Sequence, residues 1–393
     1  MTSPLRLKHV ARVIAGQSPP SEAVADLADG LPFLQGNAEF GATSPSARYE
    51  SDNAPKRCTQ GDVLLSVRAP VGALNIADRD YGIGRGLCAI RAVAVVPRFL
   101  WWWAHTQVVT LNSVATGSTY TAVSADDVGN LLVPNVPLDE QRRIADFLDT
   151  ETARIDALVA HRSRQRDLLD LSESSLLASA SDVRAPRMPV KRVASRITSG
   201  PRGWGELATD NGTAFLRITN VPRRGIELLT GDVLLVDAPP GPERERTRTR
   251  EGDVLVTITA DIGSVGIVRR AFTDANVNQH IALVRPDRSK VIPEWLAWQL
   301  KAPRTREVLT GNAYGGTKVG LGLVDIANVA VPVPSLNEQA AHLDELNRRL
   351  GFNEDMRGAV SRQAALLVER RRALITAAVT GQLDVTTARG GRS

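Results

Sequence analysis

One segment of this sequence occurs twice, 198 residues apart. Residues 130–141 read NLLVPNVPLDEQ, and residues 328–339 read NVAVPVPSLNEQ. The same offset holds without a gap for about 40 further residues, so that the SRQ of residues 163–165 returns at residues 361–363. Since the chain of 393 residues is about twice as long as this offset, the sequence predicts a duplicated module and a pseudo-twofold axis.

The parts that precede each copy repeat more loosely. Gly61-Asp62-Val63-Leu64 returns as Gly252-Asp253-Val254-Leu255, and Phe33-Leu34 returns as Phe215-Leu216. The offset drifts from 182 to 198 along this part, which indicates a shared frame with different loops. The sequence therefore predicts two globular domains, two helical segments and a tail, at residues 1–136 and 187–334, 137–186 and 335–385, and 386–393.

Short β-like runs separated by glycine and proline fill the globular parts. A turn followed by a strand is predicted at residues 61–68 and again at residues 82–90. A helix is predicted after Pro97, and it contains tryptophan at positions 101, 102 and 103, which cannot all face one side. We expect one or two of these side chains in the core and the remaining one under a neighbouring element.

A long helix is predicted after each copy of the repeated segment. Asp139 is the expected N-cap of the first helix, and Ser335 with Glu338 forms a capping-box pattern at the second. Apolar residues recur at seven-residue spacing, interrupted by Arg162 and Asn353; they are Ile155, Leu169 and Leu176 in one copy, and Val360, Leu367 and Leu374 in the other. This pattern favours an antiparallel coiled-coil pair, with two separate amphipathic helices as the alternative. The expected fold class is α+β, with two mixed α/β domains separated by the two helices.

Composition excludes several classes of protein. The net charge of +5, with 42 arginines against 6 lysines, is compatible with nucleic-acid binding. No run approaches 18 apolar residues, and the first eight residues hold no apolar stretch of a signal peptide. Cys58 and Cys88 lie 30 residues apart, a spacing that fits neither a zinc site nor a disulfide framework. We therefore expect a protein of the reducing cytoplasm, without a membrane association.

The usual motifs of catalysis are missing from the sequence. It contains no phosphate-binding G-x-x-x-x-G-K-[ST] loop, no E-x-K end of a nuclease site, and no Asn-Pro-Pro or Asp-Pro-Pro motif of an amino-methyltransferase. The five histidines show no H-x-x-x-H pairing and are interpreted as structural. These absences favour a binding protein over an enzyme.

Several of these features together point to a family. A strand-rich domain, Thr116-Gly117-Ser118-Thr119, the segment from Val133 to Gln141 and a long helix, all present twice, resemble the DNA specificity subunit of a Type I restriction–modification system. The Pro-Leu-x-Glu-Gln start of the helix is the most specific local match, and the resemblance extends from about Leu7 to Val385. The second copy departs from the family pattern at residues 315–318.

The resemblance implies a division of labour between subunits. Two target-recognition domains would each read one half of a split double-stranded DNA site, and the helices would act as a spacer and as the docking surface for two methyltransferase subunits. Restriction subunits would join the same complex. This chain would carry no catalytic residue, cofactor or metal, because S-adenosylmethionine for adenine-N6 methylation belongs to the methyltransferase, and ATP and Mg belong to the restriction subunits.

Arginine, lysine, hydroxyl and amide side chains in loops are the expected DNA contacts. In the first domain the candidates are Gln35, Asn37, Arg68, Arg85, Thr116, Ser118, Thr119 and Tyr120. In the second domain they are Arg217, Asn220, Gln279, Thr317 and Lys318. For each single residue, the alternative is an ordinary solvated loop residue.

Two other classes of protein remain as alternatives. A coiled-coil scaffold that binds only proteins explains the helices, but not two divergent copies of an arginine-bearing domain. A methyltransferase or nuclease in one chain is disfavoured by the missing motifs.

Overall fold

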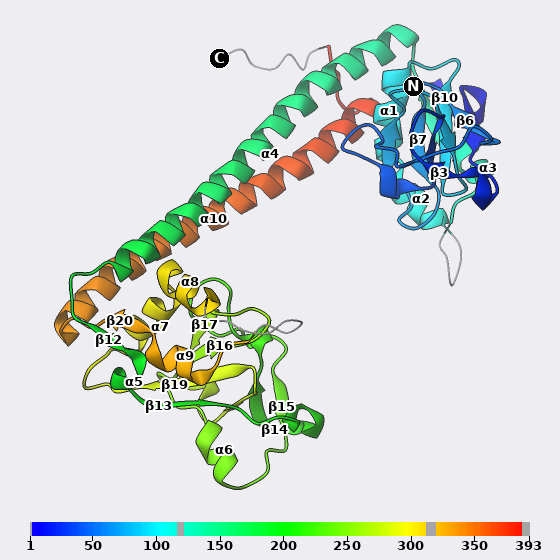
Figure 1. Cartoon of the computed structure of the whole chain (residues 1–393). Helices are drawn as coiled ribbons and strands as arrows, with labels where there is room; N and C mark the ends of the chain where they lie inside the picture. Colours follow the sequence, from blue (N-terminus) through cyan, green and yellow to red (C-terminus); the bar gives the residue numbers. More distant parts are fainter. Residues whose placement is uncertain (1, 116–121, 312–319, 387–393) are drawn as a thin grey trace. The chain divides into compact units, whose positions relative to one another are not determined.

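The computed structural model describes residues 2–115, 122–311 and 320–386. The chain forms two compact units, of which unit 1 contains residues 1–163 and 362–393 and unit 2 contains residues 164–361 (Figure 1). The division falls inside both long helices, so each unit consists of one globular domain and a part of each helix. The five-part division of the sequence stays a prediction. None of the helices in the described ranges combines the length and the apolar character that a membrane crossing requires.

The described strands of unit 1 form a two-stranded, a four-stranded and a five-stranded sheet. The first is antiparallel and pairs β1 (Thr2–Arg6) with β11 (Leu132–Asn135). The second has the order β2-β10-β7-β8, with β2 (Ala11–Ala15), β7 (Val63–Ser66), β8 (Leu74–Ile76) and β10 (Leu87–Ala92). The third has the order β3-β5-β4-β9-β6, with β3 (Ala25–Asp26), β4 (Pro32–Leu34), β5 (Tyr49–Glu50), β6 (Arg57–Cys58) and β9 (Tyr81–Ile83).

Unit 2 is built from corresponding sheets. β12 (Arg187–Pro189) pairs with β20 (Ala330–Pro332). A four-stranded sheet has the order β13-β19-β16-β17, with β13 (Ala194–Ser199), β16 (Val254–Thr257), β17 (Val265–Ile267) and β19 (Ile281–Pro286). A three-stranded sheet has the order β15-β14-β18, with β14 (Ala208–Leu216), β15 (Leu234–Val236) and β18 (Asn276–Val277).

Helices complete the two units. Those of the first globular domain are α1 (Pro97–Thr106), α2 (Val108–Val114), α3 (Ala125–Gly129) and the 3-10 helices η1 (Leu7–His9), η2 (Ser21–Ala23) and η3 (Asn37–Glu39). Those of the second are α5 (Val190–Val193), α6 (Pro242–Thr247), α7 (Pro293–Lys301), α8 (Pro303–Gly311), α9 (Leu323–Asn328), η4 (Trp204–Leu207), η5 (Ile218–Asn220) and η6 (Arg270–Phe272). The long helices are α4 (Leu138–Ser181) and α10 (Leu336–Val379).

The internal repeat predicted from the sequence is confirmed. The sheet β2-β10-β7-β8 corresponds to β13-β19-β16-β17, and the pair β1-β11 corresponds to β12-β20. In both units one further pair of strands is parallel, β4 with β9 and β14 with β18. The α+β class with two mixed domains and two long helices is therefore correct.

The repeated Gly-Asp-Val-Leu sequence forms the same turn in each unit. Gly61 and Gly252 have φ angles of +90° and +89°, which an L side chain rarely adopts. The following aspartate is buried and ion-paired across the sheet, Asp62 with Arg91 and Asp253 with Arg285, at 2.7 Å in both cases. The turn is thus fixed by its backbone conformation and by a charge pair on the neighbouring strand.

All three tryptophans of α1 are buried, between 1% and 9% exposed. Trp103 lies in the core and donates to the Leu132 carbonyl at 3.0 Å. Trp102 is covered by the long helices, because its indole N–H donates to Asp149 of α4 at 2.8 Å and Arg371 of α10 stacks over its ring. All three tryptophans belong to the core of unit 1, although only one or two were expected there, and the expectation that a neighbouring element would cover one of them holds for Trp102.

Helices α4 and α10 pair within each unit. In unit 1, Arg371 bonds Asp156 at 2.9 Å. In unit 2, Arg357 bonds Asp170 and Glu173 at 3.0 and 2.8 Å. Asn353, which interrupts the heptad pattern, is buried and donates to the hydroxyl of Ser172 at 3.2 Å. Since later residues of α4 meet earlier residues of α10, the predicted antiparallel pairing is confirmed.

The starts of the two long helices differ. Ser335 and Glu338 form the predicted capping box, in which the backbone N–H of Ser335 donates to the glutamate carboxylate at 2.9 Å. The expectation that Asp139 is an N-cap is wrong, because α4 already begins at Leu138 and the preceding residue is Pro137. Asp139 instead lies in the first turn, where its charge is favourable to the helix dipole.

Candidate nucleic-acid interface

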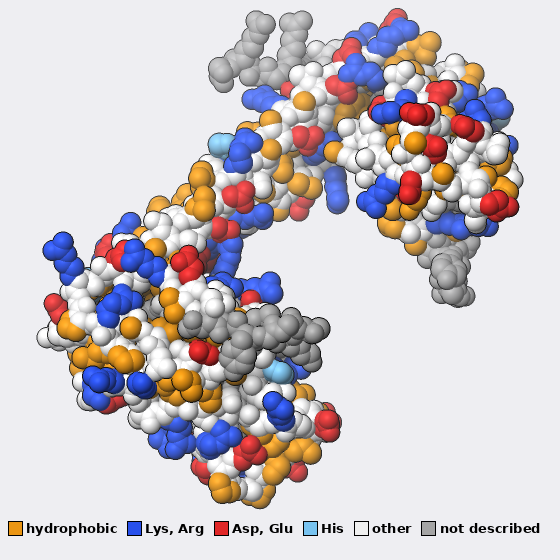
Figure 2. Space-filling model, in the orientation of Figure 1, with side chains coloured by type: hydrophobic (Ala, Val, Ile, Leu, Met, Phe, Trp, Pro, Cys, Tyr) orange, Lys and Arg blue, Asp and Glu red, His pale blue; other side chains and the backbone are white. Residues whose placement is uncertain are grey.

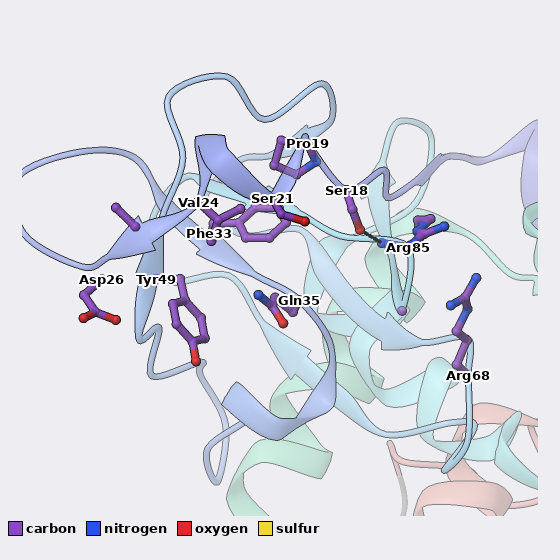
Figure 3. Close-up of a pocket in the computed structure, with 12 residues that line it drawn as sticks. Ser18, Pro19, Ser21, Val24, Asp26, Phe33, Gln35, Tyr49, Arg68 and Arg85 are labelled. Atoms are coloured by element: carbon purple, nitrogen blue, oxygen red, sulfur yellow. Dashed lines mark hydrogen bonds between the residues drawn. The ribbon is translucent and has the colours of Figure 1, made fainter.

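Neighbouring strands of unit 1 end at an open cavity of about 670 Å³. Because β4 and β9 are parallel, with Leu34 opposite Ile83, the residues that follow both strands lie at the same edge. Gln35 follows β4, and Arg85 follows β9. Arg68 lies two residues beyond the end of β7, and all three side chains line the cavity. In Figure 3, Gln35 projects between Tyr49 on one side and the two arginines on the other.

Glycines allow the turn that carries Arg85 to pack closely against the β4 edge. The backbone N–H of Gly84 donates to the Leu34 carbonyl at 2.8 Å. A Cβ atom on Gly84 would stand 3.0 Å from the Gln35 carbonyl oxygen, and one on Gly16 would stand 2.1 Å from the Gly84 oxygen. The Arg85 backbone N–H also donates to the Ser18 hydroxyl at 3.4 Å (Figure 3). The position of Arg85 is therefore set by the backbone, and its side chain makes no hydrogen bond or ion pair to the residues that the structure describes.

Within the described ranges, the two arginines at this cavity lack the carboxylate partner that several other arginines have. Figure 2 shows Lys and Arg side chains interspersed with Asp and Glu side chains, and many arginines are ion-paired, such as Arg91 with Asp62 and Arg285 with Asp253. Arg68 and Arg85 are exposed and form no ion pair within the described ranges. Two unpaired guanidinium groups and an amide at one cavity are suited to phosphate and to the hydrogen-bonding edges of bases.

The same strand ends in unit 2 carry different side chains. Phe215 and Leu216 of β14 lie opposite Asn276 and Val277 of β18, as Phe33 and Leu34 lie opposite Gly82 and Ile83. This register places Gln279 at the position of Arg85 and His280 at that of Gly86. Thr259 takes the position of Arg68, since Arg68 forms an isolated bridge with Ala122 and Thr259 forms one with Gly320.

These three residues of unit 2 are joined by hydrogen bonds. The Thr259 hydroxyl lies 2.9 Å from Nδ1 of His280, and Nε2 of His280 lies 3.0 Å from the amide nitrogen of Gln279. All three side chains are half-buried. Unit 1 thus presents two exposed guanidinium groups at this edge, whereas unit 2 presents three side chains joined by hydrogen bonds.

A family model described as "Type I restriction modification DNA specificity domain" matches residues 5–165. The putative type I restriction enzyme MjaX specificity subunit of Methanocaldococcus jannaschii is 32% identical over 168 residues, which cover 42% of this chain and 39% of the relative. The type I restriction enzyme EcoBI specificity subunit of Escherichia coli is 22% identical over 302 residues, which cover 70% of this chain and 63% of the relative. Residues 5–165 are thus similar to the DNA specificity domain of Type I restriction–modification systems.

Solved structures extend the similarity in fold over the whole chain. One similar chain comes from a solved structure described as "Structural basis underlying complex assembly and conformational transition of the type I R-M system". Its TM-score is 0.79 at 20% identity, and the match covers 98% of this chain and 99% of that chain. The HsdS subunit from Thermoanaerobacter tengcongensis has a TM-score of 0.55 at 21% identity, covering 97% of both chains. By sequence, however, the chain spans less than two thirds of the length of either curated relative.

In unit 1, the structure brings three predicted contact residues together, namely Gln35, Arg68 and Arg85. Asn37 is half-buried in η3 and does not line the cavity. Four further predicted residues lie outside the described residues: Thr116, Ser118, Thr119 and Tyr120. Ala122, which pairs with Arg68, follows that segment directly in the sequence.

In unit 2, two predicted contacts are engaged elsewhere. Arg217 pairs with Asp232 at 2.9 Å. Asn220 is fully buried, and its amide oxygen accepts the backbone N–H of Arg217 at 2.9 Å, so the expectation that Asn220 reads DNA is corrected. The equivalent residue in unit 1 is Glu39, which accepts the N–H of Gly36 in the same way. Thr317 and Lys318 lie outside the described residues.

Some candidate residues were missed by the sequence analysis. Thr259 and His280 lie at the edge that Gln279 shares, and Tyr49 and Asp26 line the cavity of unit 1. The repeated Gly-Asp-Val-Leu sequence contains a signal for Thr259, because it lies seven residues after Gly252 as Arg68 lies seven residues after Gly61. No comparable repeat marks Tyr49 or Asp26.

Proposed function

We propose that this chain is the DNA-reading subunit of a Type I restriction–modification complex, and that its two globular domains each recognise one half of a bipartite duplex site. One observation carries the proposal: a single backbone frame occurs twice, with Arg68 and Arg85 at the strand ends of one copy and Thr259 and Gln279 at the same places in the other. A shared frame with different exposed side chains is suited to reading two different base sequences.

Adenine-N6 methylation and DNA cleavage belong, in this proposal, to partner subunits. A methyltransferase would supply S-adenosylmethionine, a restriction subunit would supply ATP hydrolysis with Mg, and this chain would bind neither cofactor and act as the non-catalytic component. The assembly would work on DNA in the cytoplasm. The similarity of residues 5–165 to the Type I DNA specificity domain supports this assignment.

Two copies of one methyltransferase subunit fit the internal repeat. Each unit exposes the same two apolar positions on the long helices: unit 1 exposes Leu158 and Leu366 at 41% and 63%, and unit 2 exposes Met356 and Leu168 at 41% and 64%. Since these residues match at the 198-residue offset, identical partners would find equivalent surfaces.

Mapping of modified adenines tests the proposal. The chain is co-expressed with the methyltransferase subunit encoded beside it in a host without adenine methylation, and N6-methyladenine is located genome-wide by long-read sequencing. We expect one split motif with a fixed gap, and none when the methyltransferase is expressed alone. A complex that forms but methylates no defined motif would contradict the proposal.

A further inference from the structure

The side-chain amide of Gln279 is held in one orientation at the end of β18. Its nitrogen faces Nε2 of His280 at 3.0 Å. Gln279 is half-buried, and within the described residues its side-chain oxygen has no hydrogen-bond partner. One amide N–H and the amide oxygen therefore point away from the ring.

The orientation of the Gln279 amide sets the donor and acceptor roles of the His280 ring. A neutral imidazole has one donor and one acceptor nitrogen. Because the amide nitrogen of Gln279 donates, Nε2 of His280 accepts, and the ring proton is assigned to Nδ1. That proton is donated to the hydroxyl oxygen of Thr259 at 2.9 Å. Thr259 and His280 thus form a short relay that ends on the glutamine amide.

The backbone of this relay is anchored on both sides. The His280 N–H donates to the side-chain oxygen of Asn278 at 3.1 Å, and the His280 carbonyl accepts the Ile258 N–H at 3.0 Å. Asn278 itself donates from its backbone to the Leu216 carbonyl at 3.0 Å. A base-reading group needs such support, since small errors in its position forfeit a two-point contact.

We propose that Gln279 reads an adenine in the half-site of the second domain, and that His280 and Thr259 are positioning residues which fix the orientation of its amide. An acceptor and a donor side by side match the N6 amino group and N7 of adenine in the major groove. This inference rests on the proposed function and assigns one base contact within it.

Competition binding by the complex with its methyltransferase tests the proposal. Each position of the half-sites found for the wild-type complex is replaced in turn by the other three bases. Gln279→Ala should reduce the preference for adenine at one position by about 5- to 150-fold. Gln279→Glu should shift that position towards cytosine, because a carboxylate accepts from the cytosine N4 amino group and has no donor for adenine N7.

Two variants of Thr259, one without and one with a hydroxyl group, test the relay. Thr259→Val removes the hydroxyl and should lower the preference for adenine at the same position, whereas Thr259→Ser retains the hydroxyl and should keep it. His280→Phe should act like Gln279→Ala. A merely structural defect of the domain would lower the base preference at every position of its half-site. The base preferences in the other half-site show whether the complex is intact.

Different results would contradict the proposed function and the assignment of adenine to Gln279. If the wild-type complex shows no split motif, the proposed function is wrong. If it shows one and Gln279→Ala leaves every position unchanged, or if the affected position is a guanine, the assignment of adenine to Gln279 is wrong. Equal behaviour of Thr259→Val and Thr259→Ser would overturn the role of the relay.

Discussion

At the scale of single residues, the open cavity of unit 1 holds two guanidinium groups that form no ion pair with any described residue. Arg68 and Arg85 line it together with Gln35 (Figure 3). An arginine without a carboxylate partner keeps its five donors available, and its fork matches the O6 and N7 acceptors of guanine. The composition, with seven arginines for every lysine, could not reveal which of them are free, because ion pairing is decided by neighbours in the fold.

Substitution of these arginines should change one half of the target. Arg68→Ala and Arg85→Ala are each expected to relax a guanine position by about 1–3 kcal/mol of discrimination, measured by competition binding. Arg79→Ala is a control, because Arg79 is exposed on the same domain but does not line the cavity. A uniform loss of affinity for all sequences would show phosphate contacts instead.

His105 makes the stability of unit 1 depend on acidity. Burial, and then the charge of Arg371, lower the pKa of His105 to about 4. The unfolded chain takes up this proton near pH 6.5, so stability falls as the pH drops from about 6.5 to about 4, by up to about 3 kcal/mol. Urea unfolding followed by tryptophan fluorescence at several pH values should show a smaller loss for His105→Leu. His9→Leu, which removes an exposed imidazole, should keep the wild-type profile, and an unchanged profile for His105→Leu would refute this role.

At the scale of elements, the repeated Glu-Gln sequence forms a joint between helices. The buried amide of Gln339, near the start of α10, accepts the Ile292 N–H that precedes α7 at 2.8 Å, and donates to the carbonyls of Pro334 and Lys290. Gln141 accepts the Val96 N–H before α1 in the same way at 2.8 Å. The most specific sequence match is therefore structural, since each glutamine satisfies a backbone group at a helix start.

Loss of this joint should destabilise unit 2. Gln339→Ala leaves the part-buried Ile292 N–H, the buried Pro334 carbonyl and the Lys290 carbonyl without their partner, which costs about 1–3 kcal/mol. Gln363→Ala lies on the exposed surface of the same helix and should change stability by less than about 0.5 kcal/mol. The difference is measured as the shift of the urea midpoint. Equal shifts for the two variants would argue against the joint.

At the scale of the whole molecule, the internal repeat determines which features of the fold can be predicted from the sequence. The doubled frame, the long helices and the strand-rich domains follow from the 198-residue offset and from turn residues at fixed places. The burial and the hydrogen-bond partners of individual loop residues cannot be predicted in this way, because they depend on strand register. Asn220 is an amide in a loop by sequence but fully buried in the fold, and His280 carries no motif but lies between Thr259 and Gln279.

Replacement of one domain tests the two-reader interpretation most directly. Residues 187–334 are exchanged for the corresponding domain of a known Type I specificity subunit, and modified adenines are mapped for both complexes in the same host. We predict that one half of the split motif changes while the other half stays as in the wild type. A motif that changes in both halves, or in neither, would contradict the interpretation that each domain reads its own half-site.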